Sequence, residues 1–383
     1  MCDILKHTTM KIGDKNMKKI NRTLSLLTAA AMCTALLCSC GEVSDSSQTD
    51  SSSKATTTTT ADTTADTTTA GEESSTASVS SAPDSSVSDS SSAVTDDTKT
   101  NGITPAMWKV TSPEGNTMVM LGSFHALKDE CYPLPEAITN AYNNADILAV
   151  ECDITSTKED GEYMKNLMKQ MLYNDNTKLS QHISEEAYSA LQTYLGYWGM
   201  DISALEVYRP WAVSSTLDTL LIQDADFDSE KGLDNYLLTT AHADGKEIYE
   251  VESVDFQMNL LINFSDDIYD LMFRSFEGET KESQKQALED LYTAWKSGDI
   301  ETFLEEDNDE ELAGYTEEDK KIAEDYNNQM LYDRNKNMAK AAEDLMSQGK
   351  NVFYVVGAAH YAGEGGIIDL LEKDGYTAER VQY

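Results

Sequence analysis

The chain has 383 residues, and 68 acidic against 29 basic residues give it a formal net charge of −39. An excess of this size repels nucleic acids and anionic membrane surfaces through its long-range field, so we expect neither as a binding partner. The length would allow two or three domains if every residue folded. Residues 41–100, however, contain 32 Ser or Thr residues and almost no large apolar side chain. Such a stretch cannot bury enough surface to offset the entropy of ordering.

The N-terminal segment has the pattern of an export signal. Basic residues Lys18, Lys19 and Arg22 precede an apolar run over residues 24–37, which is too short to cross a membrane comfortably as a mature helix. The run ends in Leu-Cys-Ser-Cys-Gly and resembles a bacterial lipoprotein signal, in which a cysteine is lipidated and becomes the first mature residue. Cys40 is the best candidate for that cysteine. An ordinary secretory signal is the alternative.

The sequence therefore divides into three parts. We predict a lipoprotein signal peptide at 1–40, a disordered Ser/Thr/Asp-rich linker at 41–102 and one folded domain at 103–383. Met17 is an alternative start, in which case residues 1–16 are not translated. The mature protein is expected on the bacterial cell membrane, with the domain on the extracytoplasmic side and membrane contact only through the lipid anchor. Cys131 and Cys152 remain in the domain, and two cysteines do not decide whether they pair.

The domain opens and closes with the same succession of predicted elements. Each unit is a strand that ends in Gly-x-x-His, followed by a helix and a second strand. The segments are 117–125, 134–145 and 146–154 in the first unit, and 351–360, 365–375 and 376–383 in the second. Two such β–GxxH–α–β units suggest a duplicated half.

The sequence between the two units is mostly helical. Residues 164, 167, 168, 171 and 172 are Met or Leu at the spacing of one helix face, which indicates core or groove lining. Further helices are predicted at 185–200, 231–246 and about 317–348, with a strand at 247–253. Strands at both ends around a helical insert favour the α/β class.

Two histidines and one glutamate form the candidate site. His125 and His360 each end an apolar strand in the same Gly-x-x-His context, and the carboxyl ends of strands in open α/β sheets face the ligand crevice. Glu151 lies in an apolar strand, where a carboxylate costs several kcal/mol unless it is paired or binds a cation. Two imidazoles and a carboxylate suit a divalent metal that keeps a position open for water. The alternatives are strand-end histidines that bond to loops and a buried ion pair between Glu151 and Arg334.

Both ends of the domain resemble a known family. The segments LGSFHALKDECYPLPEAITNAYNNADILAVECDI and RNKNMAKAAEDLMSQGKNVFYVVGAAHYAGEGGIIDLLEKDGY are similar to the opening and closing motifs of the TraB/GumN family, which includes the pheromone-shutdown proteins and the TIKI metalloproteases. GLDNYLLTTAHADGKEIYEVESVDFQ and AWKSGD agree with the middle of the family. The resemblance covers about residues 104–383.

The resemblance implies an α/β fold of the erythromycin-esterase/ChaN-like kind, with both GxxH motifs and the intervening glutamate at one site. By position, His125 and His360 match the motif histidines, Glu151 matches the strand glutamate, and Arg334 matches the arginine of the family's Arg-Asn pair. The TIKI branch is described as divalent-metal-dependent proteases, so the resemblance also implies a divalent metal, whose identity stays open.

We therefore expect a surface-anchored, metal-dependent hydrolase, a peptidase acting on extracellular peptides or protein segments. His125, Glu151 and His360 would hold the metal or activate water, and Arg334 would position the substrate. The alternative is a non-catalytic binding lipoprotein that captures a peptide signal or another ligand in the same crevice. Two further site candidates are Asp234, which could instead lie on a solvated helix face, and Glu252, which could instead form a surface ion pair.

Overall fold

The structure, a computed structural model, describes residues 102–157, 160–304 and 314–383. The predicted signal peptide, the lipidation candidate Cys40 and nearly all of the predicted linker lie outside the described residues. None of the described helices is long and apolar enough to cross a membrane.

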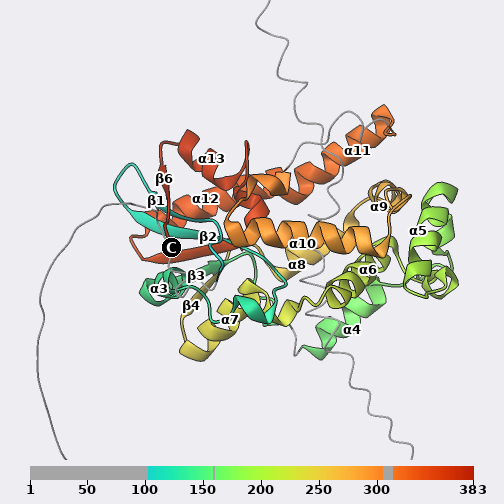
Figure 1. Cartoon of the computed structure of the whole chain (residues 1–383), viewed down its shortest axis with the longest axis horizontal. Coiled ribbons are helices and arrows are strands. Elements are labelled where there is room, and N and C mark those ends of the chain that lie inside the picture. Colours follow the sequence, from blue (N-terminus) through green and yellow to red (C-terminus); the bar gives the residue numbers. More distant parts are fainter. Residues whose placement is uncertain (1–101, 158–159, 305–313) are drawn as a thin grey trace, which may run out of the picture. The chain divides into compact units, whose positions relative to one another are not determined.

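A six-stranded mixed sheet with the order β4-β3-β5-β2-β1-β6 forms the centre of the domain (Figure 1). Its strands are β1 (Met107–Thr111), β2 (Thr117–Ser123), β3 (Ile147–Val150), β4 (Glu247–Glu250), β5 (Val352–Gly357) and β6 (Thr377–Arg380). β4, β3, β5 and β2 pair in parallel, and β1 is antiparallel to both of its neighbours. Every residue of the inner strands β3 and β5 is buried, as expected for parallel strands covered on both faces. The predicted α/β class is confirmed.

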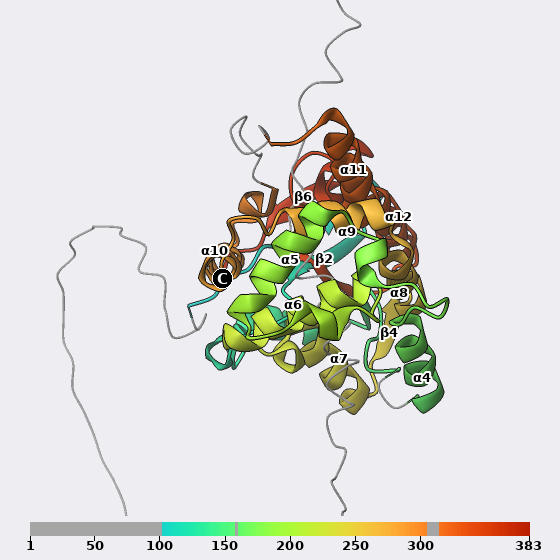
Figure 2. The same cartoon turned by 90° about the vertical axis from the view of Figure 1, so that its right-hand side faces the viewer.

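Helices cover the sheet and form a second region beside it. They are α3 (Glu136–Asn144), α4 (Gly161–Gln170), α5 (Glu185–Tyr197), α6 (Pro210–Asp224), α7 (Leu233–Asp244), α8 (Val254–Asn263), α9 (Asp266–Arg274), α10 (Lys281–Ser297), α11 (Glu317–Asn327), α12 (Asp333–Ser347) and α13 (Ile367–Lys373). In Figure 1, α12 and α13 lie on one side of the sheet, and α3 and α7 lie on the other. Helices α5, α6 and α9 belong to the insert and face the viewer in Figure 2.

Both ends of the domain contain the predicted strand–helix–strand succession. The first unit is β2, α3 and β3, and the second is β5, α13 and β6. The two strands of each unit run in the same direction, but one strand lies between β2 and β3 in the sheet, whereas two lie between β5 and β6. The units therefore share an order of elements and differ in their spacing across the sheet.

The Met/Leu stripe on α4 is only partly core. Met164, Leu167 and Met171 are buried, whereas Met168 and Leu172 are 41% and 39% exposed. The buried face of this segment therefore follows positions 164, 167 and 171.

The single helix predicted over about 317–348 is interrupted by a π-helical segment, η7 (Asn328–Tyr332), between α11 and α12. Thr316 caps α11, because its hydroxyl accepts from the Asp319 N–H at 3.1 Å while the Asp319 carboxylate accepts from the Thr316 N–H at 2.8 Å. A π-helical turn holds one more residue than an α-helical turn and is often found at functional sites. The periodic sequence pattern gave no sign of this extra residue.

Close packing joins the two GxxH motifs. A side chain on Gly122 would bring its Cβ within 2.9 Å of the Ala358 Cα, so only glycine lets these backbones approach. The buried Trp295 ring donates from Nε1 to the Gly122 carbonyl oxygen at 2.9 Å and fixes the end of β2 from the other side.

The two cysteines of the domain are buried, and neither forms a disulfide with another described residue. The Cys131 Sγ lies 3.0 Å from the Tyr292 hydroxyl, and the Cys152 Sγ–H donates to the Gln257 side-chain oxygen at 3.1 Å. Each thiol therefore has its own polar partner in a different part of the domain.

Candidate functional site

The carboxyl ends of the four parallel strands supply the site. His125 follows β2, His360 follows β5, Glu151 directly follows β3, and Glu252 follows β4. The registers pair Ser123 with Gly357 and Val150 with Val355, so these ends lie level along the sheet. The topology thus brings together side chains that are far apart in the sequence, at the edge where open α/β sheets bind ligands.

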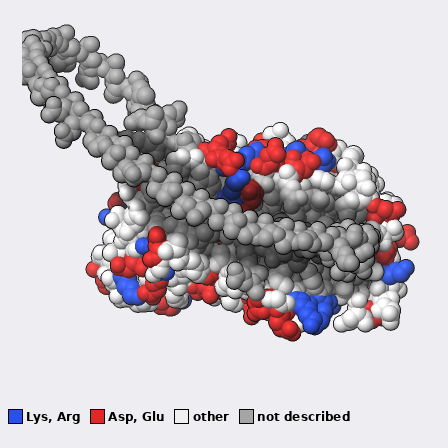
Figure 3. All heavy atoms as spheres, turned by 90° about the horizontal axis from the view of Figure 1, so that it is seen from below, with Lys and Arg blue, Asp and Glu red and all other residues white. Residues whose placement is uncertain are grey.

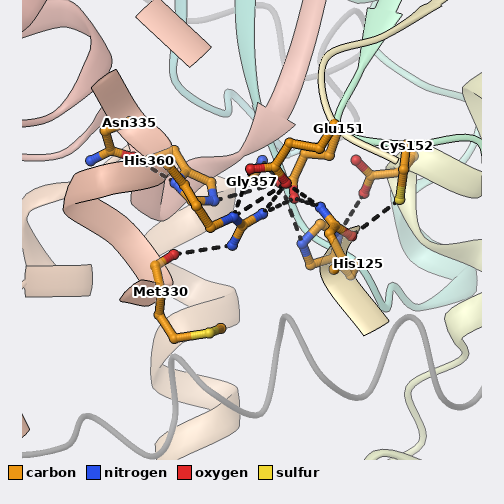
Figure 4. Close-up of polar contacts among 11 residues, drawn as sticks. His125, Glu151, Cys152, Met330, Asn335, Gly357 and His360 are labelled. Atoms are coloured by element: carbon orange, nitrogen blue, oxygen red, sulfur yellow. Dashed lines mark hydrogen bonds and ion pairs between the residues drawn. The ribbon is translucent and has the colours of Figure 1, made fainter. Parts of the chain in front are cut away.

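The Glu151 carboxylate lies between the two histidines (Figure 4). Its Oε1 is 4.0 Å from the His125 Nε2 and 3.8 Å from the His360 Nε2, and it accepts from the Gly357 N–H at 2.7 Å. A Cβ on Gly357 would lie 3.1 Å from Glu151 Oε1 and 3.4 Å from His125 Nε2. The missing side chain leaves space next to the Glu151 Oε1, the His125 Nε2 and the Cδ2 edge of the His360 ring.

Arg334 on α12 joins Glu151 to Glu252. Its Nη2 donates to Glu151 Oε2 at 2.8 Å and to Glu252 Oε2 at 2.8 Å, and its Nε donates to Glu252 Oε1 at 2.9 Å. Its Nη1 donates to the Met330 carbonyl oxygen in η7 at 3.0 Å. The ion pair between Glu151 and Arg334, which was the alternative to a ligand role for Glu151, is present, and Glu252 belongs to the same buried network. Because the guanidinium is 3% exposed and its donors already have partners, the geometry favours a role in holding Glu151 over direct contact with a substrate.

Gln257 on α8 completes this network and was missed from the sequence. Its Nε2 donates to Glu151 Oε2 at 2.9 Å and to Glu252 Oε2 at 2.7 Å, while its Oε1 accepts from Cys152. Gln257 ends the middle segment that resembles the family, and this position could have indicated a role for it. The local sequence pattern does not show which way its side-chain amide points.

Asp234, in the first turn of α7, orients His125. Its Oδ2 lies 2.7 Å from the His125 Nδ1. Because a carboxylate only accepts, Nδ1 carries a proton and Nε2 is left directed toward Glu151. Asp234 is buried, so it does not lie on a solvated helix face. The contact depends on Gly232, where any side chain would collide with the His125 carbonyl oxygen.

Asn335 orients the His360 ring, as Asp234 orients the His125 ring. The Asn335 Nδ2 donates to the Gly365 carbonyl oxygen at 2.9 Å, which turns its Oδ1 toward the His360 Nδ1 at 2.6 Å. His360 Nδ1 therefore carries the proton, and Nε2 carries the lone pair. This Nε2 is buried and has no hydrogen-bond partner among the residues that the structure describes. Asn335 was missed although it directly follows Arg334 in the matched Arg-Asn pair.

The site holds more negative than positive formal charge. Three carboxylates with largely buried side chains, Glu151, Glu252 and Asp234, face the one guanidinium of Arg334. Burial raises the pKa of Glu151, but Arg334 and the two histidines outweigh burial and hold that pKa well below its ordinary value. Burial lowers the pKa of His125, and the Asp234 carboxylate outweighs it and raises the pKa to about 9.

His360 differs from His125 in its protonation. Burial, with the nearby Arg334 charge, lowers the pKa of His360 to about 3, so its ring is neutral near pH 7. The neutral ring with a bare Nε2 is the form of histidine that binds metal ions. The same low-dielectric surroundings raise the pKa of the Cys152 thiol well above its ordinary value, which leaves it protonated and unreactive.

A pocket opens onto the two histidines. Its walls include His125, His360, Phe303, Met330 and Leu331, and its cavity volume is about 20 Å³. A cavity of this size holds about one water molecule. The walls away from the histidines are mostly apolar.

No three His, Cys, Asp or Glu side chains form a ready-made metal centre within the described parts of the chain. Metal–ligand bonds of about 2.1 Å place tetrahedral ligands about 3.4 Å apart. The separations from Glu151 Oε1 to His125 Nε2 and His360 Nε2, 4.0 and 3.8 Å, exceed this value by about half an ångström. The donor types, the space beside Gly357 and the unpartnered His360 Nε2 fit a divalent ion after a small contraction.

Several curated proteins are similar to this chain. A metalloprotease TIKI homolog of Nematostella vectensis is 25% identical over 293 residues, covering 65% of this chain and 61% of its own. Metalloprotease TIKI1 of Xenopus tropicalis is 22% identical, covering 63% of this chain and 55% of its own. Uncharacterized protein YbaP of Escherichia coli strain K12 is 25% identical over 157 residues, covering 41% and 56%. This chain thus spans less than two thirds of these relatives.

No solved structure gives a significant match to the chain. The family comparison covers most of the folded domain and includes every residue of the candidate site, from the first GxxH motif to the second. The model of the TraB/PrgY/gumN family matches residues 106–380, and the chain belongs to this family.

Proposed function

We propose that this protein is a metal-dependent hydrolase that cleaves peptide bonds at the His125–His360 site. The observation that carries the proposal is the convergence of two imidazole Nε2 atoms and one carboxylate oxygen around the space beside Gly357. The relatives that are named metalloproteases support the reaction class, and their low identity leaves the substrate to be found.

His125, His360 and Glu151 would hold the ion. The charges at the site support this assignment, because its three carboxylates outnumber the two cations that face them, Arg334 and the protonated His125 ring. A bound divalent ion would take the place of the proton on the His125 Nε2. When bound, such an ion polarises a carbonyl group and lowers the pKa of a water molecule.

The surrounding residues keep the three donors in place. Asp234 and Asn335 each hold the Nδ1–H of one histidine, so both Nε2 atoms face the same space. Arg334 and Gln257 hold Glu151 Oε2, which leaves Oε1 directed at that space. The apolar walls of the pocket would exclude bulk water from the reacting centre.

The cellular setting is part of the same proposal. The lipoprotein-like N-terminal segment supports a protein anchored on the outer side of the bacterial cell membrane, acting on peptides or protein segments there. We also infer the erythromycin-esterase/ChaN-like fold relationship, which the family resemblance and the parallel sheet support.

Metal titration and peptide turnover of the purified chain test the proposal. We expect wild type to bind one divalent ion per chain and to cleave peptides in a defined mixture analysed by mass spectrometry. The His125→Ala/His360→Ala variant should lose both properties. His242→Ala is the matched control, because His242 is half exposed and pairs with Asp153.

Two results would contradict the proposal. A wild-type chain that binds no divalent ion would refute the metal site. A chain that binds peptide without cleaving it, equally well in the double variant, would favour the binding-protein alternative.

A further inference from the structure

The Ser123 hydroxyl, at the end of β2, is a buried polar group to which the site described above gives no role. Ser123 is 2% exposed, and its Oγ makes no hydrogen bond with any residue that the structure describes. The equally buried Ser215 on α6, by contrast, donates to the Trp211 carbonyl oxygen at 2.9 Å. A buried hydroxyl without a partner destabilises a fold, so native proteins rarely keep one unless it has a further role or binds a water molecule.

The strand register turns the Ser123 side chain toward the site. Ser123 and Gly357 are paired residues of the parallel strands β2 and β5, so their side-chain directions lie on the same face of the sheet. A Cβ on Gly357 would lie 3.1 Å from the Glu151 Oε1 and 3.4 Å from the His125 Nε2. Because neighbouring strands are about 4.8 Å apart, the Ser123 side chain stands one strand away from the space beside Gly357.

Ser123 also lines the small pocket at the two histidines, together with His360. The His360 Nε2 is a second buried polar atom without a hydrogen-bond partner in the described parts of the chain. The Ser123 hydroxyl can donate to a water molecule or accept from it, and the lone pair of the Nε2 accepts from it. The cavity volume of about 20 Å³ is enough for about one water molecule, which needs at least two polar partners. The pocket therefore provides both the room and the partners.

Water is the ligand that fits this cavity. The volume is too small for the side chain of a substrate, and the pocket walls also include the apolar side chains of Phe303, Met330 and Leu331. These apolar walls offer a water molecule no hydrogen bond, so they favour its position between the Ser123 Oγ and the His360 Nε2.

We propose that Ser123 is a catalytic residue whose hydroxyl, together with the His360 Nε2, holds the water molecule that attacks the peptide bond. The inference rests on the proposed peptidase function for the reaction, and on the two unpartnered polar atoms for the water. The water oxygen forms a bond to the carbonyl carbon, and the carbon–nitrogen bond breaks. One water proton stays on the new carboxyl group, and the other ends on the released amine nitrogen. When the His360 Nε2 binds the divalent ion instead, the Ser123 hydroxyl stays available to orient the water.

Crystal structures of the full chain grown with EDTA test the water site independently of activity. We expect wild type to contain an ordered water molecule within about 3.2 Å of both the Ser123 Oγ and the His360 Nε2. The Ser123→Ala variant should lose this water. Ser215→Ala is the matched control and should keep it, because that serine is equally buried and its hydroxyl already has a partner in α6.

Steady-state peptide cleavage by the metal-loaded full chain tests the catalytic role. Acidic side chains are spread over the visible face of the domain in Figure 3, so the probe peptides carry no net negative charge. Ser123→Ala should lower kcat by about 10–100-fold, while KM and the affinity for the divalent ion change by less than about threefold. Ser215→Ala should leave kcat unchanged. A Tm of Ser123→Ala close to that of wild type shows that the loss does not come from unfolding.

Four results would overturn the proposal. They are the absence of an ordered water at Ser123 in wild type, the same water in Ser123→Ala, an unchanged kcat of Ser123→Ala when wild type cleaves peptides, and weaker binding of the divalent ion by this variant. The last result would mean that Ser123 acts through the ion. An ordered water at Ser123 in a chain that cleaves no peptide would refute the proposed peptidase and leave only the water site standing.

Discussion

Replacing Arg334 by methionine removes the one guanidinium of the buried network and keeps a side chain of similar length. Glu151 and Glu252 are 6–7% exposed at their side chains and each accepts from Arg334 at 2.8 Å. Without it, the side-chain donor that contacts both carboxylates is Gln257. The variant therefore leaves two carboxylates buried with too few partners.

Breaking a buried ion pair from one side costs about 3–5 kcal/mol, because the remaining charge stays buried without compensation. We expect Arg334→Met to lose at least this much of the free energy of unfolding, since two carboxylates lose their partner. Arg334→Lys keeps the charge but cannot contact both carboxylates through a planar fork, and should lose about 1–3 kcal/mol.

Urea denaturation followed by tryptophan fluorescence at pH 7 measures these differences. Lys336→Met is the matched control on the same helix, because Lys336 forms an exposed pair with Asp333 that contributes at most about 1 kcal/mol. Adding Glu151→Gln and Glu252→Gln to Arg334→Met should restore much of the loss. A loss below about 1 kcal/mol in Arg334→Met, or no recovery in the triple variant, would refute the reasoning.

Three further predictions concern other parts of the domain. Asn335→Leu should weaken divalent-metal binding by about 10–100-fold in a titration, because the His360 ring loses the acceptor that fixes it; unchanged affinity would contradict this. Gly357→Ala should abolish metal binding with little change in thermal stability, since its φ of −51° suits alanine while the new Cβ enters the site. Asp319 is paired with Arg274, and although burial raises the pKa of Asp319, that pair and the cap of α11 lower it to about 2. Its stabilisation is therefore complete above about pH 4 and is lost as the pH falls toward 2, so Asp319→Asn should cost about 1–2 kcal/mol at pH 6 and almost nothing at pH 2.

Five of the six strands and the first site residues were predictable because both depend on local patterns, whereas β1 was not predicted. Apolar runs that end in Gly-x-x-His gave β2 and β5, and the buried run around Glu151 gave β3. Parallel pairing then places the ends of these strands together, as the structure shows. The cost of burying an isolated carboxylate indicated that Glu151 has a partner, and the family resemblance pointed to Arg334.

The residues that orient these groups were harder to predict. Asp234, Gln257 and Asn335 lie on helices, and the rotation of each helix about its axis decides whether its polar side chain faces the site. That rotation is set by packing against the sheet, which a single sequence pattern does not contain. Asp234 and Asn335 could each have been assigned to a solvated helix face by composition alone.

The π-helical segment η7 makes the site depend on chain length as well as on residue identity. Each helical residue turns the following chain by about 100°, so the extra residue of this turn sets the direction in which all of α12 presents its side chains. Deleting one residue from 328–332 would restore a regular helix and carry Arg334 and Asn335 away from their partners together. We therefore expect a relative that lacks one residue of this segment to have no assembled site, even if it retains every site residue.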